Sequence, residues 1–446
     1  MTCLEIGAIS IVAMLVLIYI GMYVPIVLAL ISFVGVWVVK GNINIAVSLL
    51  WLASAKTVGN FLFGVIPLFV LMGLLVSTAG MGRDTYDIAQ YFMKRIRGGL
   101  GMATVVANAI FAAITGVSIA SATVFTKISV PEMLRYGYKG RFAVGVVAGS
   151  SVLGMLIPPS ILLIVYALIA EESVGDLFIA GVGPGLLLTI AFCVLISFMA
   201  YFFPNSVASP ETFTQSVETE NRLSKRELLF KSVPIITLIV VVLGGIYAGL
   251  YTPTEAGAAG AFVALLFALW RRSLSWRGLW AILVETGHIT ATLLFLIVSA
   301  SMYSRMLGIT GLPTQLGTWI GEMDASFGML LFLYVVIVLV LGTIIDSVSI
   351  MLISVPLFLV VLAPFNVDLV WFGIVTIIAN EIGLLTPPLG LAVYVIKSTL
   401  DRDDISLADI FIGAAPFALT MLFVLIAIIL VPDISLYLVE LRRSLI

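Results

Sequence analysis

The sequence predicts an all-α polytopic membrane protein built from two copies of one unit, and three observations support this prediction. Of its 446 residues, 62% are hydrophobic and only 10% are charged, and the mean hydropathy is +1.23; a soluble domain carries about 25% charged residues. Several apolar runs approach or exceed the roughly 20 residues that a bilayer crossing requires. The order of runs and breaks in residues 1–203 is repeated in residues 231–446.

Two apolar runs are interrupted by a pair of prolines. Proline removes a backbone donor and clashes with the preceding turn, so each helix should stop near the preceding glycine and restart at the prolines. At membrane depth, the freed carbonyls and amides need protein, water or a bound ion. Matched broken helices in two halves of a chain are typical of a secondary-transporter binding site. The runs are 141–170, broken at Gly154 and Pro158-Pro159, and 369–398, broken at Gly383 and Pro387-Pro388.

The first half, 1–203, should contain five crossings and one hairpin that enters and leaves by the same side. The arms of this hairpin, at about 99–135, are too short to cross comfortably on either side of the tip Thr115–Ser118. The expected segments are the helices 4–22 and 25–39, an amphipathic stretch 42–57, the helix 61–80, the hairpin, the broken helix 141–170 and the helix 176–203. Residues 204–230 are the longest polar stretch, which predicts an exposed linker.

The second half, 231–446, repeats this order, and short motifs recur at matching places. Four matches at offsets of 225 to 233 residues indicate a true duplication. Besides the proline pairs, Gly21–Pro25 recurs as Gly249–Pro253, Ile128–Pro131 as Ile353–Pro356, and Asp176–Ile179 as Asp409–Ile412. The expected segments are the helices 232–250 and 253–270, an amphipathic stretch 275–286, the helix 288–306, a second hairpin at about 326–364, the broken helix 369–398 and the helix 407–431.

The basic residues predict how the two copies are oriented. Five crossings are an odd number, so the second copy enters the membrane upside down and forms an inverted repeat. Placing the N-terminus outside leaves the linker and the flanks of the first hairpin, with most of the Lys and Arg residues, in the cytoplasm. Lys94 and Arg222 are among these, whereas Lys40, Lys56, Arg305, Arg442 and Arg443 are exceptions that fall outside. Both termini are therefore expected in the periplasm, and the second hairpin, beside Glu322, Asp324 and Asp368, should enter from the outer face.

The residue types at the tips and breaks indicate the chemistry of a central site. Hydroxyls, backbone carbonyls and one carboxylate are hard oxygen donors that could replace the water around Na⁺. The helices that restart at Pro158 and Pro387 would direct amides and partial positive charge towards the centre, which favours an anionic group. The alternative for the tip hydroxyls is that they only cap helix ends.

Three charged residues at membrane depth are functional candidates by default. Asp346 at the second tip either takes part in the site or caps a helix. Glu381 either belongs to the site or has a structural role at its mouth. Lys127 either extends to the cytoplasmic interface, as long basic side chains do, or contacts the substrate anion.

The combination of these motifs resembles a known family, the large membrane subunit of the tripartite ATP-independent periplasmic (TRAP) transporters. The resemblance covers essentially the whole chain. The residues that carry it are the tip Thr115–Ser121, Gly154 with Ile157–Ser160, Gly342 with Asp346, and Asn380-Glu381 with Gly383 and Thr386–Pro388. It implies an elevator-type, Na⁺-driven importer, in which the stretches 42–57 and 275–286 join a scaffold to a moving domain.

The resemblance also implies a set of site residues. Two sodium sites carried over by motif, with Asp346 added from the second tip, are expected to use Thr115, Ser118, Gly154, Ile157, Pro159, Gly342, Asp346, Gly383, Thr386 and Leu389. The candidate substrate-binding residues are Ser121, Lys127, Ser150, Ser151, Pro158, Ser160, Ser347, Asn380, Glu381 and Pro387. Ser121, Ser347 and Lys127 depart from the usual family residues, which are Asp, Pro and a small residue. No cofactor is expected beyond Na⁺ as the coupling ion.

The function expected from this resemblance is Na⁺-coupled import of a small organic anion, a carboxylate or a sulfonate, across a bacterial inner membrane. The implied partners are a separate small four-helix membrane subunit and a periplasmic substrate-binding protein; nothing indicates nucleic acid. One alternative is a stand-alone Na⁺/dicarboxylate symporter of similar architecture. Another is a membrane-embedded enzyme or a subunit of a redox complex, against which one histidine and two distant cysteines argue.

Overall fold

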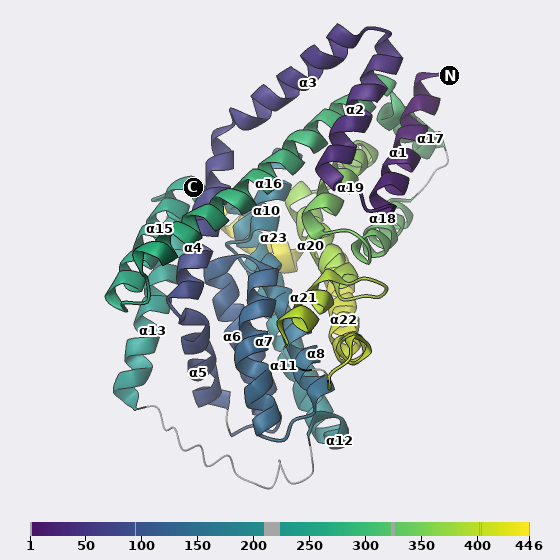
Figure 1. Ribbon diagram of the computed structural model, residues 1–446. Coiled ribbons are helices and arrows are strands. Elements are labelled where there is room, and N and C mark those ends of the chain that lie inside the picture. Colours follow the sequence, from purple (N-terminus) through teal and green to yellow (C-terminus); the bar gives the residue numbers. More distant parts are fainter. Residues whose placement is uncertain are drawn as a thin grey trace.

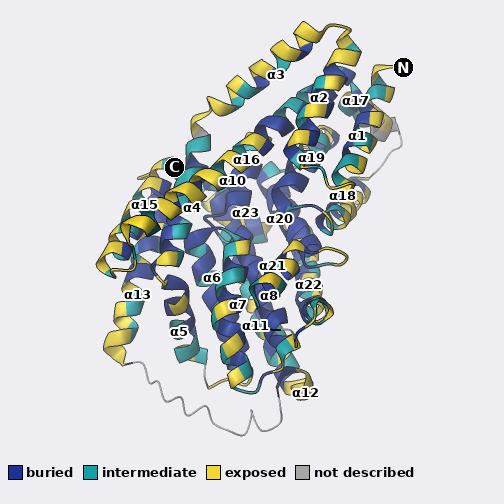
Figure 2. Cartoon of the chain, in the orientation of Figure 1, coloured by how far each residue is buried: buried dark blue, intermediate teal, exposed yellow. Residues whose placement is uncertain are grey.

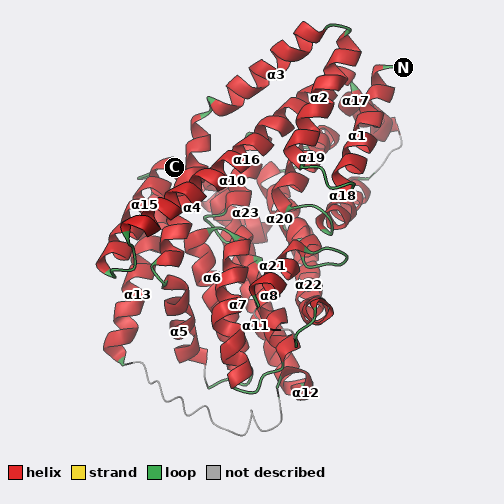
Figure 3. Ribbon diagram, viewed as in Figure 1, coloured by secondary structure: helices red, strands yellow, loops and turns green. Residues whose placement is uncertain are grey.

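A computed structural model describes residues 2–93, 95–208, 224–322, 326–400, 402 and 404–445 of the chain. The described residues form helices joined by short loops, with no named β-strand among them (Figures 1 and 3). Buried residues fill the middle of the bundle, and the exposed ones gather on outer helices such as α3 (Ile43–Val58) and α13 (Lys225–Ile239) (Figure 2). The all-helical prediction is confirmed. Lys94, Arg222, Asp324 and most of the predicted linker lie outside the described residues, as does the side chain of Glu322.

The first half follows the predicted order closely. The helix bounds are α1 (Cys3–Tyr19), α2 (Val24–Lys40), α3, the 3₁₀ turn η1 (Phe61–Gly64), α4 (Val65–Thr78), α5 (Met81–Met93), α6 (Gly99–Thr115), α7 (Ser118–Arg135), α8 (Gly140–Ser151), α9 (Leu153–Leu156), α10 (Ile161–Ala170), α11 (Val174–Phe202) and α12 (Pro204–Val207). Hairpin 1 is thus α6–α7, and broken helix 1 is α8–α10.

The second half contains the same succession of a hairpin and a broken helix. Its elements are α13, the π-helical turn η3 (Val240–Gly244), α14 (Gly245–Tyr247), α15 (Pro253–Trp270), α16 (Trp276–Thr310), α17 (Leu312–Glu322), α18 (Phe327–Gly342), α19 (Ser347–Leu362), η4 (Ala363–Phe365), α20 (Leu369–Leu384), α21 (Leu391–Thr399), α22 (Leu407–Leu430) and α23 (Asp433–Leu445). Hairpin 2 is α18–α19, and broken helix 2 is α20–α21.

Several helix assignments from the sequence were incomplete or wrong. The helices α5, α17 and α23 were not predicted. The stretches 275–286 and 288–306 were predicted as separate segments, but they form the single 35-residue helix α16 (Figure 1). Gly287 is the only residue at that junction with low helix propensity, and one glycine costs only about 1 kcal/mol in a helix. In the first half, by contrast, Gly59-Asn60 and a 3₁₀ turn separate α3 from α4.

Length and apolar composition identify the helices that can cross a membrane. Six helices in the described part of the chain meet both requirements, and eight if α4–α5 and α8–α10 each count as one bent span. Those two pairs bend by 66° and 43°. The helices α1 and α2, of 17 residues each, reach the lower end of the spanning range. The chain is a multi-span membrane protein, whereas the ten crossings and the inverted repeat remain predictions.

The chain ends and the helices that border residues 209–223 lie at different ends of the bundle. In Figure 1 the N- and C-termini lie in the upper half of the view, whereas α12 and the first turn of α13 lie in its lower part. The side of the membrane on which each lies remains a prediction.

The basic residues Arg442 and Arg443, which fit the predicted orientation poorly, are both paired. They donate to the two carboxylate oxygens of Asp176 at distances of 2.7 to 3.2 Å. The repeat counterpart of Asp176 is Asp409, which accepts from Arg141 at 2.7 Å. Since both arginines on α23 are neutralised within the protein, they carry little weight in an orientation argument based on free positive charge.

A second ion-pair cluster connects the two halves. The buried Asp84 on α5 pairs with Arg271 at the end of α15 and lies 3.5 Å from Lys231 on α13. Lys231 also pairs with Asp87, one turn further along α5. The sequence analysis overlooked α5 because its charged residues interrupt the apolar pattern, and these charges have partners from the other half of the chain.

A close helix crossing joins broken helix 1 to the last long helix of the second half. A Cβ atom added at Gly413 on α22 would lie 2.2 Å from the carbonyl oxygen of Arg141 on α8, and one added at Gly145 would lie 2.2 Å from the carbonyl oxygen of Gly413. Both obstacles are backbone atoms, so the two helices must separate before any side chain can fit.

We predict that Gly413→Ala lowers the thermal unfolding midpoint of the purified protein, because overpacking costs about 1–3 kcal/mol. The control is Gly308→Ala on α16, where nothing lies within 4 Å of an added Cβ. Equal midpoints for the two variants, measured in the same detergent, would contradict the close crossing.

Candidate functional site

The tip of hairpin 1 rests directly on broken helix 1. The amide of Ile161, the first residue of α10, donates to the carbonyl oxygen of Gly116 at 3.2 Å. A Cβ added at Gly154 would lie 2.9 Å from the carbonyl carbon of Val117 and 3.0 Å from Cα of Ser118. A Cβ added at Gly116 would lie 2.2 Å from the carbonyl oxygen of Pro159. The structure therefore brings together the two segments from which the first sodium site was predicted.

The tip of hairpin 2 rests on broken helix 2 in the corresponding way. A Cβ added at Gly342 would lie 2.7 Å from Cα of Gly383, so the two glycines meet backbone to backbone. The amides of Leu389 and Gly390 donate to the carbonyl oxygen of Thr343, at 3.1 and 3.4 Å. Gly390 is the residue that corresponds to Ile161 when the proline pairs are aligned. Each repeat thus satisfies an amide after its proline pair with a carbonyl from its own hairpin tip.

The helices restart later than predicted. The sequence analysis placed the new helix starts at Pro158 and Pro387, but α10 begins at Ile161 and α21 at Leu391. Residue Ile157 before the first pair is extended, and so is Ser160 after it. Proline disfavours a helical conformation in the preceding residue, so the pair forms an extended link between the half-helices. Some of the amides that were expected to face an anion already bond to the tip carbonyls.

Hairpin 2 is also held on broken helix 2 by hydrogen bonds of side chains. The hydroxyl of Ser347 donates to Oε1 of Glu381 at 2.9 Å, and Nδ2 of Asn380 donates to the backbone oxygen of Ser347 at 2.7 Å. We call these three residues the latch. All three are buried. The second oxygens of the latch, Oε2 of Glu381 and Oδ1 of Asn380, are buried without a hydrogen-bond partner among the described residues.

Asp346 caps the helix that follows the second tip. Its carboxylate accepts from the backbone amide of Ser349 at 3.0 Å and from the hydroxyl of the same residue at 2.5 Å. The side chain is only partly buried. Asp346 therefore has the helix-capping role that the sequence analysis gave as one of two alternatives. Ion binding by the same carboxylate remains a prediction.

The remaining polar candidates around broken helix 1 bond mainly within it. The hydroxyls of Ser150 and Ser151 donate to carbonyls one turn earlier, those of Val146 and Ala148, and Ser160 caps α10. Thr115 likewise donates to the carbonyl of Phe111. Ser121 is fully buried, and its hydroxyl has no partner in the described part of the chain. Ser118 is 4% exposed at the tip.

Three of the predicted site residues are exposed. Lys127 is exposed on the side of α7 opposite to Ser118, nine residues or about 180° of helix rotation away. Pro387 and Leu389 are exposed as well, and Thr386 is partly so, whereas Pro158 and Pro159 are buried. Break 2 is therefore accessible from outside the protein and break 1 is enclosed.

The sequence analysis missed Asn108 on α6. Its Nδ2 donates to the hydroxyl of Ser150 at 2.6 Å and so ties hairpin 1 to broken helix 1, while its Oδ1 is buried without a partner among the described residues. At the corresponding place in hairpin 2, Tyr334 bonds to Thr376 at 3.0 Å and lies 3.4 Å from Ser354. Asn108 is the only residue with an amide side chain in the mostly apolar helix α6. An isolated amide of this kind in an apolar segment is the sequence signal that could have identified it.

Comparison with known proteins gives one consistent result. The family model of the tripartite ATP-independent periplasmic transporter, DctM component, matches residues 11–434. The C4-dicarboxylate TRAP transporter large permease protein DctM of Pseudomonas aeruginosa is 34% identical over 375 residues, which are 83% of this chain and 84% of that protein. The sialic acid TRAP transporter large permease protein SiaM of Vibrio cholerae is 31% identical over 389 residues, 86% and 87% of the two chains.

Solved structures with the same general fold are also transporters. The YdaH transporter of Alcanivorax borkumensis superposes with a TM-score of 0.57 at 13% identity, covering 83% of this chain and 85% of that chain. The MtrF efflux pump of Neisseria gonorrhoeae gives a TM-score of 0.55 at 12% identity, over 86% and 83% of the two chains. At these identities the likeness establishes the fold alone.

We predict that Ser347→Ala destabilises the protein by about 1–3 kcal/mol, because it removes the donor to a buried carboxylate. A lower midpoint of thermal unfolding would report this loss. Glu381→Gln should recover part of the difference when combined with Ser347→Ala, since a neutral amide is easier to bury. The control is Ser398→Ala, whose exposed hydroxyl bonds only within its own helix; a latch variant as stable as this control would contradict the assignment.

Proposed function

The chain belongs to the tripartite ATP-independent periplasmic transporter family, DctM component, and from this premise we propose that it carries a small organic anion into the cell, coupled to Na⁺. The proposal depends on one observation: the tip of each hairpin packs against the broken helix of its own half. Such breaks expose backbone oxygens at membrane depth, where only protein, water or an ion can satisfy them.

The donor set fits Na⁺. At tip 1 and break 1 the candidate ligands are backbone carbonyls and the hydroxyls of Thr115 and Ser118; at tip 2 and break 2 they are carbonyls and the hydroxyl of Thr386. Oxygen ligands of this kind suit hard cations. The unpartnered oxygens of Asn380 and Glu381 lie beside the second set and add two further acceptors. We propose two sodium sites, one at each tip, with Asp346 contributing charge near the second.

The proposed cargo is an organic acid. Relatives are named for C4-dicarboxylates, sialic acid and isethionate, which are carboxylates or a sulfonate. A negative group would approach the start of α10 or α21, where helix amides and the helix dipole favour it. The polar side chains nearest to these starts are Ser121, Ser347 and Asn380. Lys127 contributes to anion attraction only at a distance, since it faces away from the tip.

The proposed transport cycle is an elevator movement. The hairpins and broken helices of both halves pack on one another, α10 on α19 and α20, and α7 on α21. The helices α2, α3 and α4 pack instead along α16. We propose that the first group moves as a body relative to the second, in an inverted-repeat topology with both chain ends in the periplasm.

The proposed partners are a small membrane subunit and a periplasmic binding protein, which the name of the family implies. This chain covers 58% of the Isethionate TRAP transporter permease protein DctMQ of Oleidesulfovibrio alaskensis. The stand-alone symporter is not favoured, because the matching family model describes a tripartite system.

We predict that proteoliposomes containing this chain and its small subunit accumulate a radiolabelled organic acid only with an inward Na⁺ gradient and the cognate binding protein. Replacement of Na⁺ by K⁺ should reduce uptake to the level of empty vesicles. Equal uptake without the binding protein would support the stand-alone symporter instead.

Asp346 allows the roles of ion ligand and helix cap to be separated. Asparagine caps a helix about as well as aspartate, so Asp346→Asn can keep the capping bond from the Ser349 amide while it removes the charge. We predict at least about a tenfold higher Na⁺ requirement for uptake, which corresponds to about 1.4 kcal/mol. Asp346→Ala should lose both stability and Na⁺ dependence. Wild-type Na⁺ dependence in Asp346→Asn would leave only the capping role.

A further inference from the structure

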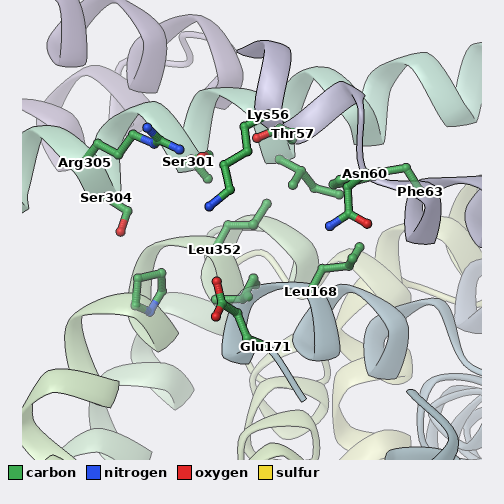
Figure 4. Close-up of a pocket in the computed structure, with 14 residues that line it drawn as sticks. Lys56, Thr57, Asn60, Phe63, Leu168, Glu171, Ser301, Ser304, Arg305 and Leu352 are labelled. Carbon is green, nitrogen blue, oxygen red and sulfur yellow. The ribbon is translucent and has the colours of Figure 1, made fainter. Parts of the chain in front are cut away.

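A cavity of about 290 Å³ lies apart from the tips and breaks. One wall comes from the end of α3, the following turn and the C-terminal half of α16, and the opposite wall comes from the end of α10 and from α19 (Figure 4). Leu352 and Pro356 on α19 follow Ser347 by five and nine residues, or about 8 and 14 Å of helix rise. The cavity is therefore separate from the candidate sodium and substrate residues but shares the helix α19 with them.

The cavity is lined by more basic than acidic side chains. Lys56 at the end of α3 and Arg305 on α16 line one wall, and Glu171 at the end of α10 lines the other. Figure 4 shows the Lys56 amine and the Glu171 carboxylate extending into the space between the walls. The cavity lining therefore contains two basic side chains and one acidic side chain, an excess of one basic group. It therefore attracts anions.

The other lining groups favour an organic anion over an inorganic one. The hydroxyls of Ser301 and Ser304 lie on the same wall as the two cations and can donate to a carboxylate, whereas Leu168 and Leu352 give the opposite wall an apolar surface. Small-molecule sites are typically concave and mostly apolar, with a few placed polar groups, and have volumes of about 300–1,000 Å³. A cavity at the lower end of this range accommodates a short carboxylic acid.

The backbone at Glu171 adds a second observation. This residue has a φ of 56°, the left-handed conformation that glycine adopts most easily. It forms the C-cap of α10, and its amide donates to the carbonyl of Ala167. A glutamate held in this conformation at the edge of a cavity brings a carboxylate opposite two cations. Strained positions of this kind concentrate at functional sites.

From this arrangement we infer that the cavity binds a small organic carboxylate between Lys56, Arg305 and the hydroxyls of Ser301 and Ser304, at a site distinct from the tips and breaks. Glu171 opposes binding, because its charge has the same sign as the ligand, and so keeps the affinity low enough for release. Since the cavity lies between elements that pack along α16 and elements that carry the breaks, the site is positioned to hold an anion on the route to the centre. Only this last step rests on the proposed function.

The test uses the whole chain in nanodiscs of neutral phosphatidylcholine. Thr57→Cys, in a background with Cys3→Ser and Cys193→Ser, places one thiol in the cavity lining without altering a proposed ligand. We expect an anionic methanethiosulfonate reagent to modify it about tenfold faster than a cationic one. Succinate should slow the reaction, and the neutral analogue succinamide should not. The matched control is Cys3, an exposed native thiol outside the cavity, in the background with Cys193→Ser alone.

Two substitutions should change succinate protection in opposite directions, which misfolding of the variants would not do. Lys56→Gln should weaken succinate protection about twofold to fivefold, and Glu171→Gln should strengthen it by a similar factor. Lys40→Gln, an exposed lysine at the end of α2, should change nothing. Loss of protection in both cavity variants, or none in the parent protein, would overturn the inference.

The source of the anion and the independence of this site are checked separately. Protection by phosphatidylglycerol in the nanodisc without any effect of succinate would identify a lipid phosphate as the ligand and overturn the inference. Protection needs neither Na⁺ nor transport, so it should persist in Asp346→Asn. A chain that fails to transport but protects the thiol would refute the proposed function alone.

Discussion

The arrangement of this protein depends on one constraint: a helix broken within a membrane must satisfy its freed backbone groups with other parts of the protein. Both breaks meet this constraint in the same way. An amide after each proline pair, that of Ile161 or Leu389, donates to a carbonyl at the neighbouring hairpin tip. Glycines at Gly154, Gly342 and Gly383 allow the backbones to approach closely enough for this contact. The hairpins are therefore part of the same structural device as the breaks, and neither would be stable in hydrocarbon alone.

The two copies of this device share their backbone contacts but differ in side chains and in access. Hairpin 2 is held by the buried latch of Ser347, Asn380 and Glu381, whereas hairpin 1 is held by the bond from Asn108 to Ser150. Break 1 is enclosed and break 2 is exposed at its prolines. Contacts made by the backbone depend little on sequence and are suited to a function common to both halves, such as binding the same ion. Side chains found in one half only are suited to the step that distinguishes one cargo from another.

Most of the fold was predictable because long apolar runs and proline pairs leave few alternatives. The tip at Thr115–Ser118 and the bounds of α15 were predicted correctly. The helix α5 was not, because Asp84 and its neighbours make that segment polar, and their partners Lys231 and Arg271 are distant in sequence. The helix restarts were misplaced by three and four residues because a proline pair can either begin a helix or form an extended link. Asn108 was missed because its partner, Ser150, lies on another helix.

The ion pairs at the last helix of each half show which feature of the repeat is conserved between the copies by physical need. Asp176 and Asp409 occupy the same place, three residues after a capping serine at the start of α11 and α22. A carboxylate in the first turn of a helix interacts favourably with the partial positive charge at the helix N-terminus. The position alone therefore accounts for an acidic residue in both halves. The arginines come from unrelated places, Arg141 on α8 and the pair Arg442 and Arg443 on α23. The helix start thus accounts for the acidic residue, and each half of the chain supplies the cation for the acidic residue of the other half, so these ion pairs join the two halves.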